Sequence, residues 1–190
     1  MSPFYSAKGD EGVTGLPGQR RVAKSDLQIE TLGFLDEATS MLGMARAHSR
    51  LDSTREILLH VQRDMYRLMS SVAAAPGESK RFTDIGAEDV TWLEEHIRQF
   101  ENSIKMPREF IVPGDTIPAA VIDLARTVVR RAERRVVELF QKGVIQNPQL
   151  LRYLNRLSSL CFVLELCENQ AAGMEQPTSA RIKFIDRHDP

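Results

Sequence analysis

The sequence predicts an all-α protein, a five-helix bundle that carries an ordered, glycine-rich N-terminal arm. Two observations support this: apolar residues recur at helical spacing in five segments, and no segment alternates convincingly with the period of a strand. A chain of 190 residues is long enough for one domain with a substantial core. Within it we expect the arm over residues 1–24, the bundle over 25–173 and a polar, partly ordered tail over 174–190.

Capping signals bound the first two helices. The first begins at the capping box Ser25-Asp-Leu-Gln28, and the second opens at another, Ser53-Thr-Arg-Glu56. Pro76 ends the second helix. The residues expected to face the core are Leu27, Leu32, Leu35, Ala38, Leu42 and Ala45 in the first helix, and Ile57, Val61, Met65, Leu68 and Val72 in the second.

The third helix is shorter and leads into a loop. It starts near Asp84 and ends near Asn102, and its apolar face holds Val90, Leu93, Ile97 and Phe100. Residues 105–116 include the sequence FIVPGD and have no helical period, so we expect an ordered loop there.

Proline and glycine mark the last two helices. The fourth has Pro118 in its first turn and ends at Gly143, the positions where these residues are favoured. The fifth has Asn147 as its cap, with Pro148 at the first helical position, and it ends at Gly173.

Composition excludes several classes of partner. The net charge of −1 creates no general field that would attract nucleic acid or an anionic membrane surface. No apolar run approaches the length that spans a bilayer. Cys161 and Cys167 lie six residues apart in a helical pattern, hence on different sides of the helix, which disfavours a disulfide or a shared metal. These features favour a reducing, cytoplasmic setting without nucleic-acid or membrane partners.

The arm contains the stretch KGDEGVTGLPGQRR at residues 8–21, with a glycine at every third position up to Gly18. A collagen triple helix is excluded because the period stops there. The chain has no GxxxxGK[ST] loop, no HExxH and no CxxC, and no histidine follows a glutamate by three residues. A loop that holds a phosphate chain and a simple N-terminal arm both fit the glycines.

The fourth helix has an unusual polar face. Beside its expected buried residues, Arg126, Arg130, Glu133 and Arg134 share one side, and five of the ten residues from 126 to 135 are arginine. This face is either a solvated surface with helical ion pairs or a site for a polyphosphate, whose oxygens suit the planar arginine fork. Asn155 interrupts an apolar run in the fifth helix and is a weaker candidate for the same site. The buried residues of the fourth helix are expected to be Ala125, Val128, Ala132, Val136 and Leu139.

These motifs, in this order, resemble the PduO-type ATP:corrinoid adenosyltransferase family. The resemblance extends from residue 5 to about residue 165, and its most specific parts are the glycine element and the sequence ARTVVRRAER. The matching segments are YSAKGDEGVT at 5–14, KSD at 24–26, GFLDEATS at 33–40, FIVPGD at 110–115, ARTVVRRAER at 125–134 and LNRLSS at 154–159.

The resemblance implies a helical bundle that assembles as a homotrimer, with active sites between neighbouring subunits. It implies transfer of the 5′-deoxyadenosyl group of ATP to cob(I)alamin, giving adenosylcobalamin and triphosphate. Mg²⁺ would be carried by the ATP phosphates, without a protein cage. Further partners would be an adenosylcobalamin-dependent enzyme or a cobalamin reductase.

The resemblance also assigns roles to residues. Asp36 would pair with Arg130 across the subunit boundary, and Phe110 would pack under the corrin ring and keep the lower ligand off. Arg130, Asp36 and Phe110 are therefore the expected catalytic residues. The expected ATP-binding residues are Ser6, Ala7, Lys8, Gly9, Asp10, Thr14, Gly15, Lys24, Arg126, Arg130, Arg131, Glu133, Arg134 and Asn155.

The chain departs from the family pattern at a few positions. Ala7 stands where lysine is usual, Ser159 where aspartate is usual, and Asp123 where histidine is common. The loss of charged groups at Ala7 and Ser159 leaves a second hypothesis open: a catalytically weak member that carries corrinoid or senses ATP. A helical protein whose arginine face binds nucleic acid is a third, disfavoured by the near-neutral charge and the lack of interleaved aromatic residues.

Overall fold

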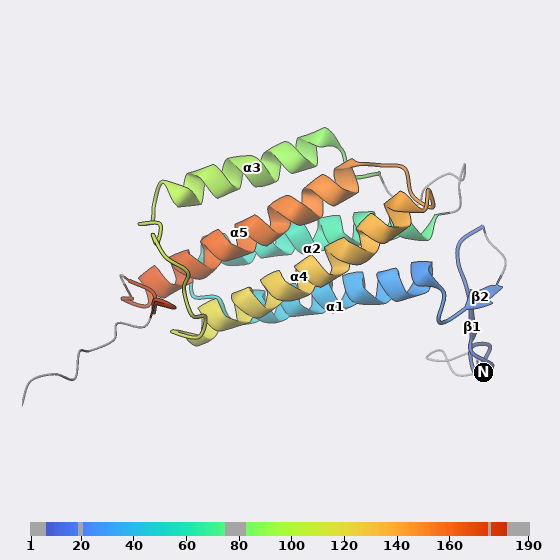
Figure 1. The fold of residues 1–190 in the computed structure, drawn as a ribbon, viewed down its shortest axis with the longest axis horizontal. Coiled ribbons are helices and arrows are strands. Elements are labelled where there is room, and N and C mark those ends of the chain that lie inside the picture. Colours follow the sequence, from blue (N-terminus) through green and yellow to red (C-terminus); the bar gives the residue numbers. More distant parts are fainter. Residues whose placement is uncertain (1–6, 19–20, 75–82, 175, 182–190) are drawn as a thin grey trace, which may run out of the picture.

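The computed structural model describes residues 7–18, 21–74, 83–174 and 176–181, and in this part of the chain it is a five-helix bundle with a small hairpin at one end (Figure 1). The predicted fold class is confirmed. The elements are β1 (Val13–Gly15), β2 (Arg21–Ala23), α1 (Leu27–His48), α2 (Asp52–Ala73), α3 (Ala87–Glu101), α4 (Ile117–Gln141) and α5 (Gln149–Ala171).

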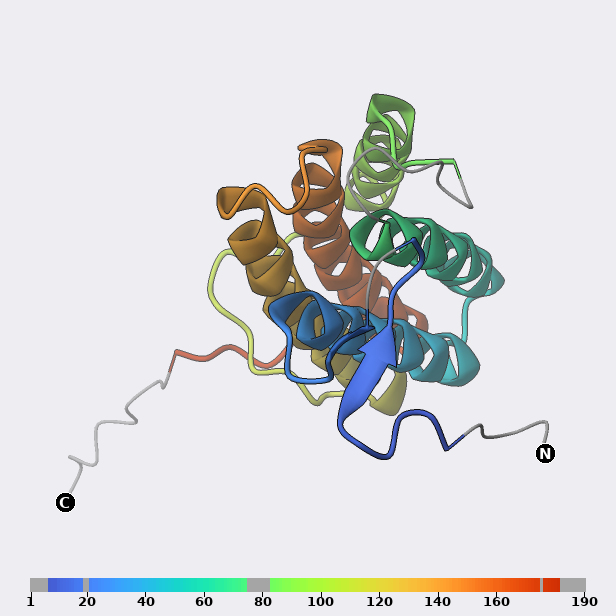
Figure 2. The same cartoon turned by 90° about the vertical axis from the view of Figure 1, so that its right-hand side faces the viewer.

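Four helices surround the core, and α3 lies on the outside against α5 (Figures 1 and 2). Helix α4 packs between α1 and α5, and α2 completes the group against α1. Because α4 and α5 are long antiparallel neighbours, side chains from residues far apart in the sequence meet along their shared groove. The hairpin lies beyond the first turn of α1, while the loop between α3 and α4 lies at the other end of the bundle, with the end of α5 (Figure 1).

The core consists of the predicted apolar stripes. Every stripe residue named above for α2 and α4 is buried, while Leu27 and Leu32 at the start of α1 are only partly buried. Burying each leucine, isoleucine or valine side chain stabilises the fold by about 1.5–3 kcal/mol, so this interior provides most of the driving force. No described helix has both the length and the apolar character needed to cross a membrane.

The predicted cap of the first helix is wrong by one residue, and that of the second helix is wrong by two. In α1 the cap is Asp26, whose carboxylate accepts from the N–H of Gln28 at 2.8 Å, and the Ser25 side chain has no such role. Helix α2 begins at Asp52, ahead of the Ser53 box, because a distant residue holds the backbone just before its first turn. The buried carboxylate of Glu168 on α5 accepts from the N–H groups that immediately precede α2, at 2.9 and 3.3 Å.

The remaining caps use local side chains. Helix α3 starts at Ala87, later than the predicted Asp84, because Asp89 in its first turn accepts from the N–H of Gly86 at 2.8 Å. In α4 the Thr116 hydroxyl accepts from Ala119 N–H at 3.4 Å, and Pro118 occupies the first turn as predicted.

In α5 the predicted cap residue supplies the capping group. The side chain of Asn147 accepts from the N–H of Gln149 at 2.9 Å, although Pro148 precedes the first helical residue and does not occupy it. Gly143 and Gly173, which follow α4 and α5, have positive φ values of 72° and 84°, which glycine adopts without strain.

The arm contains two short strands that the sequence pattern does not predict. Strand β1 pairs antiparallel with β2, and Thr14 lies opposite Val22. Three residues per strand are too few for a period of two to be recognised, which explains the miss. The hairpin fixes the course of the glycine-rich arm.

A buried polar network joins α2, α3 and α5. Arg67 on α2 donates to Asp64 at 2.8 Å and to both carboxylate oxygens of Asp89 at 2.8 and 2.9 Å. The buried hydroxyl of Tyr153 on α5 donates to Asp64 at 2.9 Å. Because Arg67 bonds to carboxylates of both α2 and α3, the network ties the outer helix α3 to the bundle.

Candidate functional site

The predicted polar face of α4 forms one concave site with α5. A cavity of about 460 Å³ is lined by Arg130, Glu133, Arg134, Val137 and Asn155. The side-chain amide of Asn155 donates to Glu133 at 3.2 Å, so the packing of α5 on α4 brings the weaker candidate into the arginine site. The structure therefore assembles four of the predicted site residues from two helices.

Four of the five arginines of α4 divide into two groups. Arg131 pairs with Glu37 on α1 and stacks on the ring of Phe34, with its guanidinium carbon 5.3 Å from the ring centre. Arg135 pairs with Glu138 and with a glutamate of α1. These two arginines therefore lie on a charged face with ion pairs.

The second group, Arg130 and Arg134, carries positive charge that no ion pair of the described chain neutralises. Arg130 and Arg134 are exposed, and no carboxylate of the described chain forms an ion pair with either guanidinium. Arg134 donates to the backbone carbonyl of Arg130 at 3.0 Å, and both residues line the same cavity. Two neighbouring guanidinium groups repel unless an anion lies between them, so this cavity suits a phosphate chain.

Arg126 faces a different part of the molecule. Its Nε and Nη2 atoms lie 2.8 and 2.6 Å from Oδ1 of Asp123, and both residues line a second cavity of about 460 Å³. Phe110, Ile111 and Phe162 provide apolar parts of the same lining. The structure thus places Arg126 with Phe110 and not in the cavity of Arg130.

Phe110 lies in the loop between α3 and α4 and is 90% exposed. Its ring also lines the cavity that contains Arg126, so it is free to contact a large apolar ligand or a partner at that cavity. The loop itself is ordered, as predicted for residues 105–116, and ends at the cap of α4.

The segment after α5 fixes this loop. Backbone hydrogen bonds of 2.8 Å join Val112 N–H to the carbonyl of Thr178, and Ala180 N–H to the carbonyl of Phe110. Both oxygens of Asp115 accept from Thr178, at 2.9 Å from its N–H and 2.6 Å from its hydroxyl. Nothing in the sequence pattern predicts this pairing, and residues 176–181 hold the loop in the position from which Phe110 projects.

We expect Asp115→Ala to release the segment from the loop. The variant loses two hydrogen bonds to a carboxylate, each worth about 1.5–3 kcal/mol, so the exchange rates of the Val112 and Ala180 amide protons should rise at least tenfold. Hydrogen exchange followed by mass spectrometry or NMR measures this. The exposed Glu56 on α2 provides a control, because Glu56→Ala should leave these rates unchanged. Unaltered exchange in Asp115→Ala would show that other contacts hold the segment.

The glycine-rich arm places Gly9 beside Lys24. A side-chain carbon at Gly9 would lie only 3.1 Å from the ammonium of Lys24, so a larger residue there would push the lysine aside. Arg21 donates to the backbone carbonyls of Lys8 and Val13. Ala7 has a φ of 56°, a left-handed conformation that is unusual for a residue other than glycine. Asp10 and Gly15 are exposed, Thr14 lies in β1, and Ser6 falls outside the described residues.

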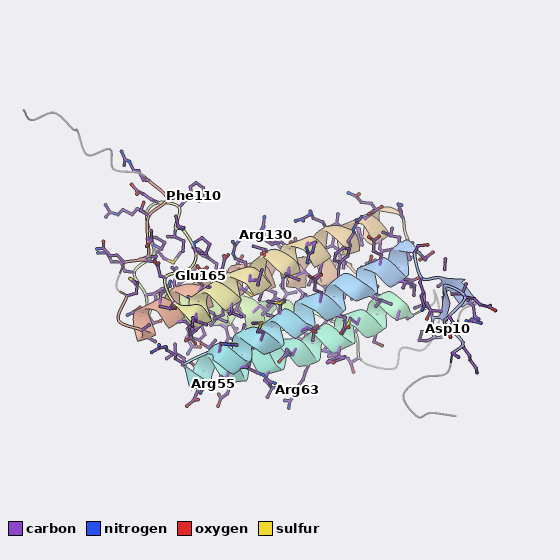
Figure 3. The ribbon with its side chains drawn as sticks, turned by 90° about the horizontal axis from the view of Figure 1, so that it is seen from below. Asp10, Arg55, Arg63, Phe110, Arg130 and Glu165 are labelled. Atoms are coloured by element: carbon purple, nitrogen blue, oxygen red, sulfur yellow. The ribbon has the colours of Figure 1, made fainter. Side chains whose placement is uncertain are left out.

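A single chain keeps three parts of the predicted site apart. Figure 3 shows Asp10 of the arm at one end of the bundle, Phe110 at the other, and Arg130 between them on α4. Asp36 is exposed on α1 and has no ion pair with Arg130 within the described chain. These residues therefore do not form a complete site within one copy of the described chain.

Neither cysteine offers a nucleophile. Cys161 and Cys167 are free and buried. Burial raises the pKa of Cys161 to about 12 and that of Cys167 to about 11, so both thiols stay protonated at neutral pH. Among the described residues, no group of three or more His, Cys, Asp or Glu side chains is arranged to hold a metal ion.

Comparison with known proteins identifies the family of the chain. The sequence profile of the family described as cobalamin adenosyltransferase matches residues 4–168. The chain belongs to this cobalamin adenosyltransferase family. It is 37% identical to the cobalamin adenosyltransferase of Cupriavidus metallidurans, over 91% of each chain, and 36% identical to the corrinoid adenosyltransferase of Bacillus subtilis, over 97% of each.

Solved structures of the family share the fold. A phenylalanine-to-alanine variant of the PduO-type ATP:corrinoid adenosyltransferase from Lactobacillus reuteri, complexed with cobalamin and ATP, superimposes with a TM-score of 0.85 at 26% identity. The match covers 94% of this chain and 99% of the other. An arginine-to-lysine variant of the enzyme from the same organism, complexed with ATP, gives a TM-score of 0.81 at 27% identity, over 93% and 99%.

Sequence reasoning missed two polar groups near Phe110. One is Asp115 with Thr178, which join only after α5 has brought the tail beside the loop. The other is Glu165 on α5, which is 1% exposed and close to Asp123. A signal for Glu165 was present: it is the one charged residue in the otherwise apolar run LCFVLELC at 160–167.

Proposed function

We propose that this chain is an ATP:corrinoid adenosyltransferase, which transfers the 5′-deoxyadenosyl group of ATP to cob(I)alamin. The observation that carries the proposal is the cavity in which Arg130 and Arg134 lie beside Glu133 and Asn155, in a member of the cobalamin adenosyltransferase family. The two guanidinium groups, which have no ion pair within the described chain, suit a triphosphate, and the exposed Phe110 suits the face of a corrin ring.

The chemistry requires no nucleophile from the protein. The cobalt(I) centre of the substrate attacks the 5′ carbon of ATP, the bond from that carbon to oxygen breaks, and the electron pair leaves with the triphosphate. The protein must orient the carbon and stabilise the charge that develops on the leaving group. Arg130 and Arg134 perform this task, together with Lys24 and the backbone of the arm around Gly9. Mg²⁺ is bound through the phosphate oxygens.

The active form is a homotrimer, in which the arm of one subunit meets the arginine cavity of the next. The separation of Asp10 from Arg130 within one chain supports this arrangement, because the two halves of a nucleotide site would otherwise remain unused. In the same assembly Asp36 pairs with Arg130 across the boundary. The protein operates in the cytoplasm, where its free cysteines remain reduced and where a cobalamin reductase or an adenosylcobalamin-dependent enzyme is its partner.

A turnover experiment tests the proposal. The protein is mixed with Mg-ATP and chemically reduced cobalamin, and the absorbance change to adenosylcobalamin is followed against a control without protein. Conversion above the control is the expected result. Absence of conversion contradicts the proposal, and tight cobalamin binding without conversion would support the second hypothesis, a carrier or sensor in which Ala7 and Ser159 have weakened catalysis.

A further inference from the structure

A buried acid lies behind the cavity that Phe110 helps to form. Glu165 on α5 is 1% exposed, and its Oε2 atom has no hydrogen-bond partner among the described residues. Glu165 and Phe110 lie at the same end of the bundle (Figure 3). A carboxyl group so completely removed from water needs either a cation of its own or a proton.

The cation that acts on Glu165 within the described chain, Arg126, already has a partner. Arg126 points both Nε and Nη2 at one oxygen of Asp123, and this pair lines the Phe110 cavity. Asp123 is 9% exposed, so its carboxylate is itself largely desolvated. With Asp123 and Glu165 both ionised, the cluster would carry one negative charge more than Arg126 can compensate.

The groups that face Glu165 therefore favour its neutral form. Burial is the main cause that raises its pKa to about 8, followed by the charge of Asp123; a hydrogen bond with that residue adds to the effect. From the loop before α4, Asp115 acts in the same direction, while Arg126 opposes it. Cys161, the neighbouring titratable group on α5, is a neutral thiol at these pH values.

We infer that Glu165 is a positioning residue for the corrinoid side of the site: its protonated carboxyl, held against Asp123, keeps the Asp123–Arg126 pair in place and the wall of the Phe110 cavity free of net charge. This inference rests on the proposed function, because it is Phe110 that packs under the corrin ring. Loss of the proton adds a desolvated negative charge beside the Asp123–Arg126 pair. Arg126 then divides its hydrogen bonds between two carboxylates, and the cavity loses the shape that fits the ring.

The first test measures cobalamin affinity against pH. Dissociation constants for cob(II)alamin are determined by absorbance titration, with saturating Mg-ATP, for the wild type, Glu165→Gln and the exposed control Glu56→Gln. If only the protonated form binds and its pKa is about 8, the wild-type Kd at pH 9 is about tenfold weaker than at pH 7. The control Glu56→Gln should show the same ratio of Kd at pH 9 to Kd at pH 7 as the wild type. In Glu165→Gln the side chain is neutral at both pH values, so this ratio should be close to one.

The second test needs no cobalamin. The folded protein holds the Glu165 proton up to about pH 8, whereas the unfolded chain releases it near the ordinary glutamate value. Stability from this group is therefore present below the unfolded pKa and lost as pH rises toward 8. The unfolding free energy of the wild type should decline relative to that of Glu165→Gln over this range.

The outcomes separate the inference from the proposed function. A wild type that binds cobalamin equally at pH 7 and 9, or a Glu165→Gln variant that keeps the wild-type ratio, overturns the inference while the enzyme assignment stands. A flat stability difference also overturns it, because Glu165 would then hold no proton. A wild type that binds no cobalamin at any pH contradicts the proposed function and, with it, the role of the cavity.

Discussion

Replacing Arg130 by alanine should reduce the rate of adenosyl transfer at least about a hundredfold, because the triphosphate leaving group loses a guanidinium that stabilises its charge. The same change should alter the free energy of unfolding by no more than about 1 kcal/mol. Arg130 is exposed beside the buried stripe of α4 and forms no ion pair within the described chain, so the fold does not depend on it. The substitution should therefore lower the rate of adenosyl transfer without lowering the free energy of unfolding to a comparable extent.

The measurement is single-turnover formation of adenosylcobalamin, with urea unfolding of the same preparations. Arg130→Lys keeps the charge but loses the planar fork, so its rate should fall between those of the wild type and the alanine variant. Arg63→Ala is the matched control, because Arg63 is exposed on α2 and points away from the bundle (Figure 3). An alanine variant at position 130 that keeps most of the wild-type rate would show that the cavity on α4 is not the triphosphate site.

The parts of the molecule that the sequence predicts are those set by local spacing. The stripe that includes Ala125 and Val136 repeats with the period of a helix, so burial of one face and exposure of Arg130 follow together. Helix ends were also predictable to within a few residues where the capping group is close in sequence, as with Asn147. Such features need no knowledge of how the helices pack.

The parts that the sequence does not predict depend on tertiary partners. The start of α2 is set by Glu168, more than a hundred residues later in the chain, so the nearby Ser53 box is a misleading signal. Arg126 and Arg130 share one face of α4 by spacing, yet the loop that carries Phe110 completes the cavity at Arg126, whereas Asn155 of α5 completes the cavity at Arg130. Spacing along one helix identifies a common face, but the neighbouring elements decide which cavity each side chain joins.

The largest effect on stability should come from Arg67. Arg67→Met should lower the free energy of unfolding by about 3 kcal/mol, because it leaves the carboxylates of Asp64 and Asp89 in a largely buried place without their cation. The methionine side chain retains much of the apolar volume, so the loss reports on charge and hydrogen bonding more than on a cavity. Arg63→Met on the exposed side of the same helix is the control and should change stability by less than about 0.5 kcal/mol.

The pH dependence of this loss identifies its cause. Burial alone raises the pKa of Asp89, but hydrogen bonds from Arg67 and from Gly86 N–H outweigh it and hold the pKa below the ordinary value. The corresponding stability is present above the unfolded pKa and is lost as pH falls through the folded one. In Arg67→Met the effect of burial on the pKa of Asp89 is no longer outweighed by Arg67, so protonation of Asp89 at low pH stabilises the folded variant. The difference between the wild type and Arg67→Met, measured by urea unfolding, should therefore be greatest near pH 7 and shrink toward pH 4. A difference that stays constant over this range would mean that Arg67 stabilises the bundle by packing, and that its ion pairs with Asp64 and Asp89 contribute little.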